Sequence, residues 1–261
     1  LASSAASDVY KRQVSKLTWR AFERHYSLTT YEQLISKLDS TIPVYPDWIK
    51  GIACALGSAG LAFLYSGDMI AFIVTVICSL IGYFGRTLSV RFGCNEYVGI
   101  AIGGFAAMVS AYGFYSHIEQ DSLVYVLVCC TLFMIPGVPL INSVIDTINN
   151  HILSGITRAI RTILIVGSMT LGMAMALYFS PMPAFSFVDI KPHVLTIEQI
   201  IGSFTAAASF AVLFNAPVRL LVSIGIGGVL CVFIRNLLAV EFGFSIPGAT
   251  FVGAAVMSVI Y

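Results

Sequence analysis

Residues 69–86 read MIAFIVTVICSLIGYFGR, an apolar run whose one charged side chain is Arg86 at its end. A helix needs about 20 predominantly apolar residues to cross the hydrocarbon core of a bilayer, so this run is long enough to span a membrane. Similar runs lie on both sides of it. The sequence therefore predicts an all-α, polytopic membrane helix bundle of eight transmembrane helices, at residues 49–66, 69–86, 97–116, 122–135 continuing past a break, 160–179, 199–215, 218–238 and 246–261.

The composition also indicates that lipid is the main solvent of the chain. Of its 261 residues, 58% are hydrophobic and 10% are charged, whereas soluble domains are about 25% charged. Mean hydropathy is +0.90. The formal net charge is only +1, and nucleic-acid binding needs many clustered Lys and Arg residues to neutralise phosphates. The lipid bilayer is therefore an expected partner, and nucleic acid is not.

The sequence contains no motif that indicates catalysis or cofactor binding. It has no P-loop, zinc-ligand spacing or nucleophile elbow. Its six cysteines form no Cys-x-x-Cys pair, and most lie within apolar runs, where a thiol behaves as a small hydrophobic side chain. We therefore predict no enzyme activity, no cofactor and no metal site.

The charged residues divide the chain near Lys50, because the first 50 residues hold 12 of its 27 Lys, Arg, Asp and Glu side chains. Within that segment, residues 3–13 resemble a translated sequencing adapter, so we interpret residues 1–13 as non-native and exclude them from the fold. We expect the rest to comprise a cytoplasmic N-terminal segment, a first five-helix membrane repeat, an external linker and a partial second membrane repeat, at residues 14–48, 49–180, 181–198 and 199–261.

Lys and Arg residues near the helix ends set the expected orientation, because cytoplasmic loops carry an excess of both. With the N-terminus in the cytoplasm, only Lys191 and Arg235 fall outside. Six others then lie on the cytoplasmic side: Lys50, Arg86, Arg91, Arg158, Arg161 and Arg219. The sequence therefore favours a cytoplasmic N-terminus.

The hydropathy contains an internal repeat at an offset of 149 residues. The segment Tyr83-Phe84-Gly85-Arg86 aligns with Val232-Phe233-Ile234-Arg235 and, after one insertion, Phe92-Gly93 aligns with Phe242-Gly243. Five helices separate the starts of the two copies, and this odd number predicts that the second copy is inverted relative to the first. The second copy stops at Tyr261 and is incomplete, so we expect about ten helices in the complete protein.

Residues 133–151, FMIPGVPLINSVIDTINNH, depart from plain membrane-helix composition. Pro136 and Pro139 each remove a backbone donor and Gly137 tolerates unusual dihedrals, so we expect the helix to break there. A break within a membrane is tolerated where it faces protein or a water-filled cavity. The half-helix after the break directs its free N–H groups and positive dipole end at the gap, which suits a carboxylate.

Polar side chains recur on one face of this half-helix. Together they offer donors for the carboxylate of a zwitterionic amino acid, a carboxylate for its ammonium group and amides for a side-chain hydroxyl. The predicted substrate-binding residues are Pro136, Gly137, Pro139, Asn142, Asp146, Asn149 and Asn150. A carboxylate within a bilayer costs about 2.5–3.5 kcal/mol, so Asp146 is also the candidate for proton coupling. The alternative is a proline kink whose polar face has already reached the membrane interface.

Three other charged residues are secondary candidates. Asp68 lies in the tight connection between the first two membrane helices, where a turn residue is the simpler interpretation. Arg86 and Arg235 lie at helix ends, where a long side chain can extend its charge to the membrane surface.

The chain resembles the threonine/serine exporter family of bacterial inner-membrane carriers in one motif, Pro136-Gly137-Val138-Pro139-Leu140-Ile141-Asn142, followed by Asp146, Asn150, Ser154 and Gly155. The resemblance extends from Trp19 to Ser180 for a first domain and from Thr196 to Tyr261 for the start of a second. It implies a carrier of about ten helices that exports L-threonine and L-serine, is driven by the proton gradient and has a cytoplasmic N-terminal region.

The leading hypothesis is a secondary transporter of threonine and serine that works by alternating access as an antiporter. Export of dicarboxylates such as succinate is the alternative within transport, and it should need cationic ligands such as Arg86 or Arg158 in the cavity. A non-transporting membrane scaffold or assembly subunit is the alternative from another class, and it would lack a central polar cavity. Some family members are split into two subunits, which leaves a homo-oligomer or a second membrane subunit open as a partner.

Overall fold

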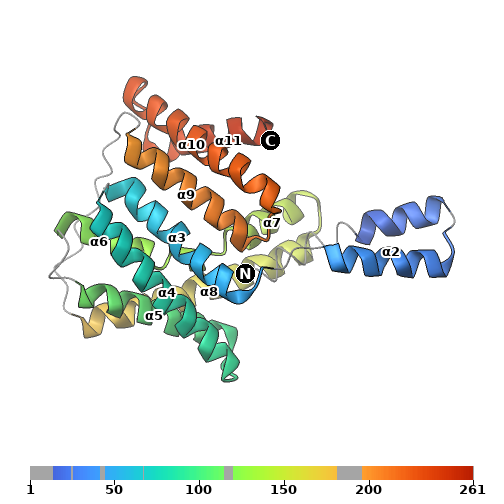
Figure 1. Ribbon diagram of the computed structural model, residues 1–261, viewed down its shortest axis with the longest axis horizontal. Helices are drawn as coiled ribbons and strands as arrows, with labels where there is room; N and C mark the ends of the chain where they lie inside the picture. The colour runs from blue at the N-terminus through green and yellow to red at the C-terminus, as the bar shows by residue number, and fades with distance from the viewer. Residues whose placement is uncertain are drawn as a thin grey trace.

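The structure, a computed structural model, describes residues 14–24, 26–41, 45–66, 68–114, 120–180 and 196–260. Every regular element within these ranges is a helix (Figure 1). The predicted all-α class is therefore confirmed. The adapter-like residues 1–13 and residues 181–195 of the expected linker lie outside the described residues.

The polar N-terminal part of the chain forms a helical hairpin that extends away from the other helices (Figure 1). Its first helix covers residues 14–23, and its second helix is α2 (Leu28–Thr41). The hydroxyl groups of Thr18 and Tyr31 lie 2.9 Å apart and link the two helices. The hairpin buries little of its apolar surface, because Trp19 and Phe22 remain exposed.

Between residues 47 and 260, the described chain forms nine α-helices and one 3-10 turn. In chain order these are α3 (Asp47–Ser66), α4 (Met69–Arg91), α5 (Glu96–Gly113), α6 (Gln120–Cys129), η2 (Leu132–Met134), α7 (Gly137–Ile148), α8 (Ile152–Phe179), α9 (Ile197–Leu213), α10 (Val218–Glu241) and α11 (Ile246–Ile260). Because α6, η2 and α7 together correspond to the expected broken helix, these elements correspond to the eight helices expected from the sequence.

Length and composition identify four helices that can cross a membrane: α3, α4, α8 and α10. The segment that contains α6 and η2 qualifies together with α7 as a fifth, bent by 55° at the break between them. Helices α9 and α11 are apolar but shorter. The chain is thus a multi-pass membrane protein with four or five candidate spans among its described residues, and the count of eight spans stays a prediction.

Two helices extend by at least five residues beyond the limits expected from the sequence. Helix α4 continues to Arg91 rather than ending at Arg86, and α8 begins at Ile152 rather than at residue 160. The expected start of α8 is wrong because Ser154, Thr157 and Arg158 interrupt the apolar pattern while the backbone remains helical. Helix α8 therefore begins directly after α7, and the two helices pack together as a hairpin.

The helices pack in the spatial order α11, α10, α9, α3, α4, α5, α8 and α7. Figure 1 shows α9 between α10 and α3. Helix α6 contacts α3 and α4. The helices before residue 181 and those after residue 195 are thus joined through the contact between α3 and α9.

Glycines permit close contacts between these helices, as expected where no hydrophobic effect drives helices together in lipid. A Cβ atom at Gly103 of α5 would lie 2.8 Å from the carbonyl oxygen of Gly82 in α4. A Cβ atom at Gly172 of α8 would overlap the carbonyl oxygen of Ala101 in α5. Helices α4, α5 and α8 therefore approach one another at their backbones.

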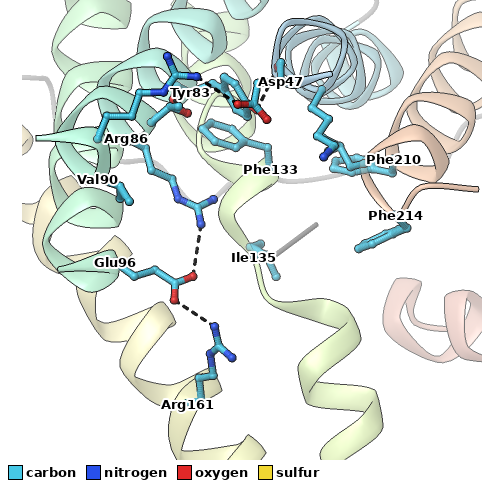
Figure 2. A pocket seen from close by; sticks show the side chains of 14 residues that line it. Asp47, Tyr83, Arg86, Val90, Glu96, Phe133, Ile135, Arg161, Phe210 and Phe214 are labelled. Carbon is cyan, nitrogen blue, oxygen red and sulfur yellow. Dashed lines mark hydrogen bonds and ion pairs between the residues drawn. The ribbon is translucent and has the colours of Figure 1, made fainter. Parts of the chain in front are cut away.

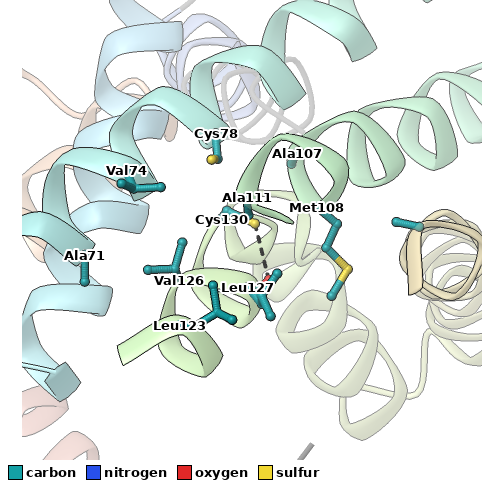
Figure 3. Packing of buried hydrophobic residues seen from close by; sticks show 11 residues of the cluster. Ala71, Val74, Cys78, Ala107, Met108, Ala111, Leu123, Val126, Leu127 and Cys130 are labelled. Atoms are coloured by element: carbon teal, nitrogen blue, oxygen red, sulfur yellow. Dashed lines mark hydrogen bonds between the residues drawn. The ribbon is translucent and has the colours of Figure 1, made fainter. Parts of the chain in front are cut away.

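The largest buried cluster lies between α4, α5, α6 and α8 (Figure 3). It comprises Ala71, Val74, Cys78, Ala107, Met108, Ala111, Leu123, Val126, Leu127, Cys130 and Ala176. Cys54 and Cys129 are buried as well, which agrees with the packing role expected for the cysteines. Cys94 is the exception, because it is exposed in the loop between α4 and α5.

Candidate functional site

The predicted helix break is present. Helix α6 ends at Cys129, the 3-10 turn η2 follows, and Ile135 has an extended backbone (φ −62°, ψ 123°). Pro136 then precedes the first residue of α7 and is fully buried. Proline suits this position because the first turn of a helix leaves its N–H groups without intrahelical partners. The 55° bend at this point aims the start of α7 away from the axis of α6.

Asp146 is held on α7 by two side chains of the following helix. Its Oδ2 atom accepts a hydrogen bond of 2.8 Å from the Ser154 hydroxyl and lies 3.1 Å from Nε of Arg158. Both partners belong to α8, and Gly155 between them lies against the backbone of Ser143. The α7–α8 hairpin therefore fixes the position of the Asp146 carboxylate.

The other predicted polar residues occupy two environments. Asn142 is partly buried on α7. Asn149 and Asn150 are exposed in the turn after α7, where Asn150 has a left-handed backbone (φ 60°). Asparagine adopts this conformation more readily than most residues. The N–H group of His151 donates to the Asp146 carbonyl oxygen at 2.8 Å and closes the turn.

A cavity of about 550 Å³ lies beside the break (Figure 2). It is lined by the starts of α3 and α5, the second half of α4, Phe133 of η2 with the following Ile135, the first half of α8 and the end of α9. The lining residues are Asp47, Lys50, Tyr83, Arg86, Thr87, Val90, Arg91, Glu96, Phe133, Ile135, Arg161, Phe210, Leu213 and Phe214. Of the predicted site residues, only Arg86 is among them.

One wall of the cavity carries a row of three charged side chains (Figure 2). The Glu96 carboxylate lies between two guanidinium groups, with Oε1 3.6 Å from Arg86 and Oε2 3.0 Å from Arg161. Gly93 in the preceding loop has a positive φ of 89°, and the Asn95 side chain accepts a hydrogen bond from the Tyr97 N–H group at 3.1 Å. This loop begins α5 beside the end of α4 and brings Glu96 to Arg86.

The cavity has an excess of positive charge. Four cationic side chains and two carboxylates line it, which leaves two positive charges unbalanced. Arg91 pairs at 3.2 Å with Asp47, the first residue of α3, and both side chains are exposed. Phe133, Ile135 and Phe210 provide apolar lining near the charged wall. The arrangement can hold a small molecule that has one carboxylate end and a short carbon skeleton.

The secondary candidates differ in their surroundings. Asp68 caps α4, because its Oδ1 atom accepts a hydrogen bond from the Ile70 N–H group at 2.9 Å. Arg235 is buried, and its guanidinium group donates to Oδ1 of Asn236 from Nε at 3.2 Å. It also lies over the ring of Tyr65, 5.9 Å from the centroid. Arg235 is therefore inside the bundle of described helices and does not extend to a surface.

Sequence reasoning missed Glu96 and Arg161 as site residues. The sequence gives Glu96 no role, and it indicates Arg161 only as one of the charges that favour a cytoplasmic N-terminus. The sequence does contain a signal for Glu96, because Arg86 and Glu96 flank the short Phe92-Gly93 loop between two helices and can therefore lie close together. No comparable signal existed for Arg161, since its proximity depends on the packing of α8 against α5.

Two known protein-family descriptions match the sequence of this chain. The family described as "Putative threonine/serine exporter" (ThrE) matches residues 10–180, and the related description "Threonine/Serine exporter, ThrE" matches residues 199–261. The chain belongs to the threonine/serine exporter family. The matched regions correspond to the two domains expected from the resemblance.

Two curated proteins are similar to this threonine/serine exporter family member. The "Probable succinate transporter subunit YjjP" of Klebsiella aerogenes is 23% identical over 161 residues, which cover 58% of this chain and 60% of the relative. The protein of the same name in Escherichia coli (strain K12) is 23% identical over 154 residues, with the same two shares. The chain thus covers about three fifths of the length of these relatives. No solved structure matches the chain.

Proposed function

We propose that the chain forms part of a secondary transporter that exports L-threonine and L-serine across the bacterial inner membrane by alternating access, coupled to protons. The family match supports transport rather than catalysis. The observation that carries the proposal is the helix break at Ile135 and Pro136, beside a cavity lined by charged side chains. Broken helices at a polar cavity are typical substrate sites of secondary transporters. The charged cavity also argues against a membrane scaffold, because polar groups inside a bilayer are costly.

The proposed transporter contains two inverted repeats, and the contact between α3 and α9 supports this symmetry. Gly57 of α3 lies against Ser209 of α9, and Gly60 of α3 lies against Ala206 of α9. At the offset of 149 residues, Gly57 is equivalent to Ala206 and Gly60 to Ser209. The two contacts are therefore copies of each other, as a two-fold axis between the repeats requires.

A second pair of contacts supports the same repeat. A Cβ atom at Gly103 would lie 2.9 Å from Cβ of Arg86, and one at the equivalent Gly253 would lie 3.8 Å from the backbone nitrogen of Arg235. Gly93 and its counterpart, Gly243, both have positive φ. In the proposed topology the N-terminus is cytoplasmic, all eight expected helices lie in the membrane, and a full second repeat brings the carrier to about ten.

The substrate site in this proposal includes the half-helix that follows the break, with Pro136, Gly137 and Pro139 at its start and Asn142 and Asp146 along it. Asn149 and Asn150 close its far end. Asp146 is the proton-coupling residue in this proposal. Its contact with Arg158 supports that role, because a carboxylate that can exchange a cationic partner for a proton suits a proton relay.

Export of a dicarboxylate such as succinate is the second candidate, and the charge of the cavity favours it. A zwitterionic amino acid adds no net charge, whereas a succinate dianion would balance the two excess positive charges. Arg86 lies in the cavity, as this alternative requires, while Arg158 pairs with Asp146 instead. The names of the relatives refer to succinate transporter subunits, and in this case a second membrane subunit completes the transporter.

Side-by-side efflux measurements test both candidates. The product of the full reading frame is reconstituted in liposomes loaded with labelled L-threonine or labelled succinate, and a pH gradient is imposed. Threonine efflux that L-serine inhibits supports the first candidate. Succinate efflux without threonine efflux supports the second. Release of neither solute, with the chain alone and with a second membrane subunit added, would contradict a transport function.

A further inference from the structure

The position of Glu96 resembles that of a bound ligand. Each of its two carboxylate oxygens meets a different guanidinium group, Oε2 at 3.0 Å from Arg161 and Oε1 at 3.6 Å from Arg86. Guanidinium groups bind carboxylates and phosphates through such charge-assisted contacts. Since the two arginines belong to different helices, α4 and α8, they form a carboxylate-binding site that Glu96 of α5 occupies.

This carboxylate-binding site faces the cavity. The side chains of Arg86, Glu96 and Arg161 all line it, with fractional exposures of 16%, 33% and 49%. Glu96 lies in the first turn of α5 and is only partly buried, so its side chain can rotate away from the two arginines without unfolding a helix. Phe133 and Ile135 line the same cavity and can contact the carbon skeleton of a ligand. The cavity volume of about 550 Å³ lies within the range of small-molecule sites.

Replacement of Glu96 by another carboxylate keeps the arginines paired. Loss of a partner from a buried ion pair is costly, because it leaves a desolvated charge without compensation. Exchange of one carboxylate for another avoids that cost at Arg86, the more buried of the two arginines. An incoming ligand therefore competes with Glu96 rather than with water.

We propose that Glu96 is an internal occupant of the carboxylate-binding site formed by Arg86 and Arg161, and that the carboxylate of a small organic acid or amino acid binds by displacing it. This inference rests on the transport function proposed above, and it names the group through which that substrate is recognised. The empty and loaded states then differ in which carboxylate the two arginines hold.

Equilibrium binding to the purified chain tests this proposal. The probes are succinate, L-threonine and L-threoninol, which lacks the carboxylate. Glu96→Gln removes the competing charge with little change in shape, so we expect affinity for the bound carboxylate probe to rise about tenfold, the effect of one charge-assisted hydrogen bond. L-threoninol should bind neither form. Asp47→Asn is the matched control, since it removes the other carboxylate of the cavity and should raise affinity less.

Several outcomes would overturn the proposal. These are unchanged or weaker binding in Glu96→Gln, an equal gain in Asp47→Asn, and binding of no carboxylate by either form. If Glu96→Gln loses its monodisperse profile in detergent, Glu96→Asp replaces it. The shorter side chain cannot reach both arginines, so affinity should still rise, by a smaller factor. A native chain that transports neither solute while Glu96→Gln binds more tightly would contradict the transport function alone.

Discussion

The carboxylate of Glu96 lies 3.0 Å from the guanidinium group of Arg161, although the two residues are 65 positions apart in the chain. This contact joins the start of α5 to α8. Arg158 lies about one turn earlier on the same helix and pairs instead with Asp146 of α7. Two arginines of one helix thus serve two carboxylates, one at the cavity and one within the α7–α8 hairpin.

The location of Arg161 predicts that its replacement affects binding more than stability. Arg161 is half exposed, and ion pairs of exposed groups contribute about 0–1 kcal/mol. We expect Arg161→Gln to change the thermal midpoint little and to lower the affinity for the carboxylate substrate about tenfold. Arg219→Gln is the control, because Arg219 is an exposed arginine at the start of α10 that does not line the cavity. Equal affinities in the two variants would contradict this prediction.

The exposed thiol of Cys94 provides a test of the orientation. Cys54, Cys78, Cys129 and Cys130 are buried and Cys231 is partly buried in the middle of α10, whereas Cys94 is exposed in the loop between α4 and α5. A cytoplasmic N-terminus places this loop in the cytoplasm. We therefore expect a membrane-impermeant maleimide to label the chain in inverted membrane vesicles and not in intact cells. Cys94→Ser should abolish the labelling. Labelling of Cys94 in intact cells would show that this loop is external and would contradict a cytoplasmic N-terminus.

The sequence predicted the helices and the break because both depend on local patterns. Apolar runs identified the positions of the helices, and Pro136 with Gly137 located the end of the α6 segment, since proline and glycine act on the backbone where they occur. The limits of α8 were less accurate. Ser154 and Arg158 look like loop residues in the sequence, but they face Asp146 across the α7–α8 hairpin.

The cavity could not be predicted because it depends on which helices are neighbours. Its charged wall combines Arg86, Glu96 and Arg161 from three helices, and its apolar lining includes Phe210 from the second half of the chain. The pairing of Arg86 with Glu96 could have been inferred from the short loop between α4 and α5. The contributions of α8 and α9 follow from close contacts at Gly172 and Gly60, which local patterns do not specify.

Two glycines of α8 predict opposite effects of the same substitution. A methyl group at Gly172 would overlap the backbone of Ala101 in α5, whereas Gly167 has no atom within 4 Å of the equivalent position. Gly172→Ala should therefore separate α5 and α8 and cost about 1–3 kcal/mol. Gly167→Ala should be neutral or stabilise by up to about 1 kcal/mol, because alanine favours helix. Thermal unfolding in one detergent compares them, and similar midpoints would contradict the close contact of the two helices.

Asp146 and Ser154 allow the proposed coupling role to be separated from a structural one. Asp146→Asn keeps the shape of the side chain but removes the charge that faces Arg158 at 3.1 Å, and Ser154→Ala removes only the 2.8 Å hydrogen bond to the same carboxylate. Each change should lower stability, by about 1–3 kcal/mol for the charged contact and about 0.5–1.5 kcal/mol for the hydroxyl. We expect Asp146→Asn to abolish efflux driven by a pH gradient, while Ser154→Ala retains most of it. If Asp146→Asn exported the substrate at the native rate and with the native pH dependence, Asp146 would have no part in proton coupling and its contact with α8 would only hold the hairpin together.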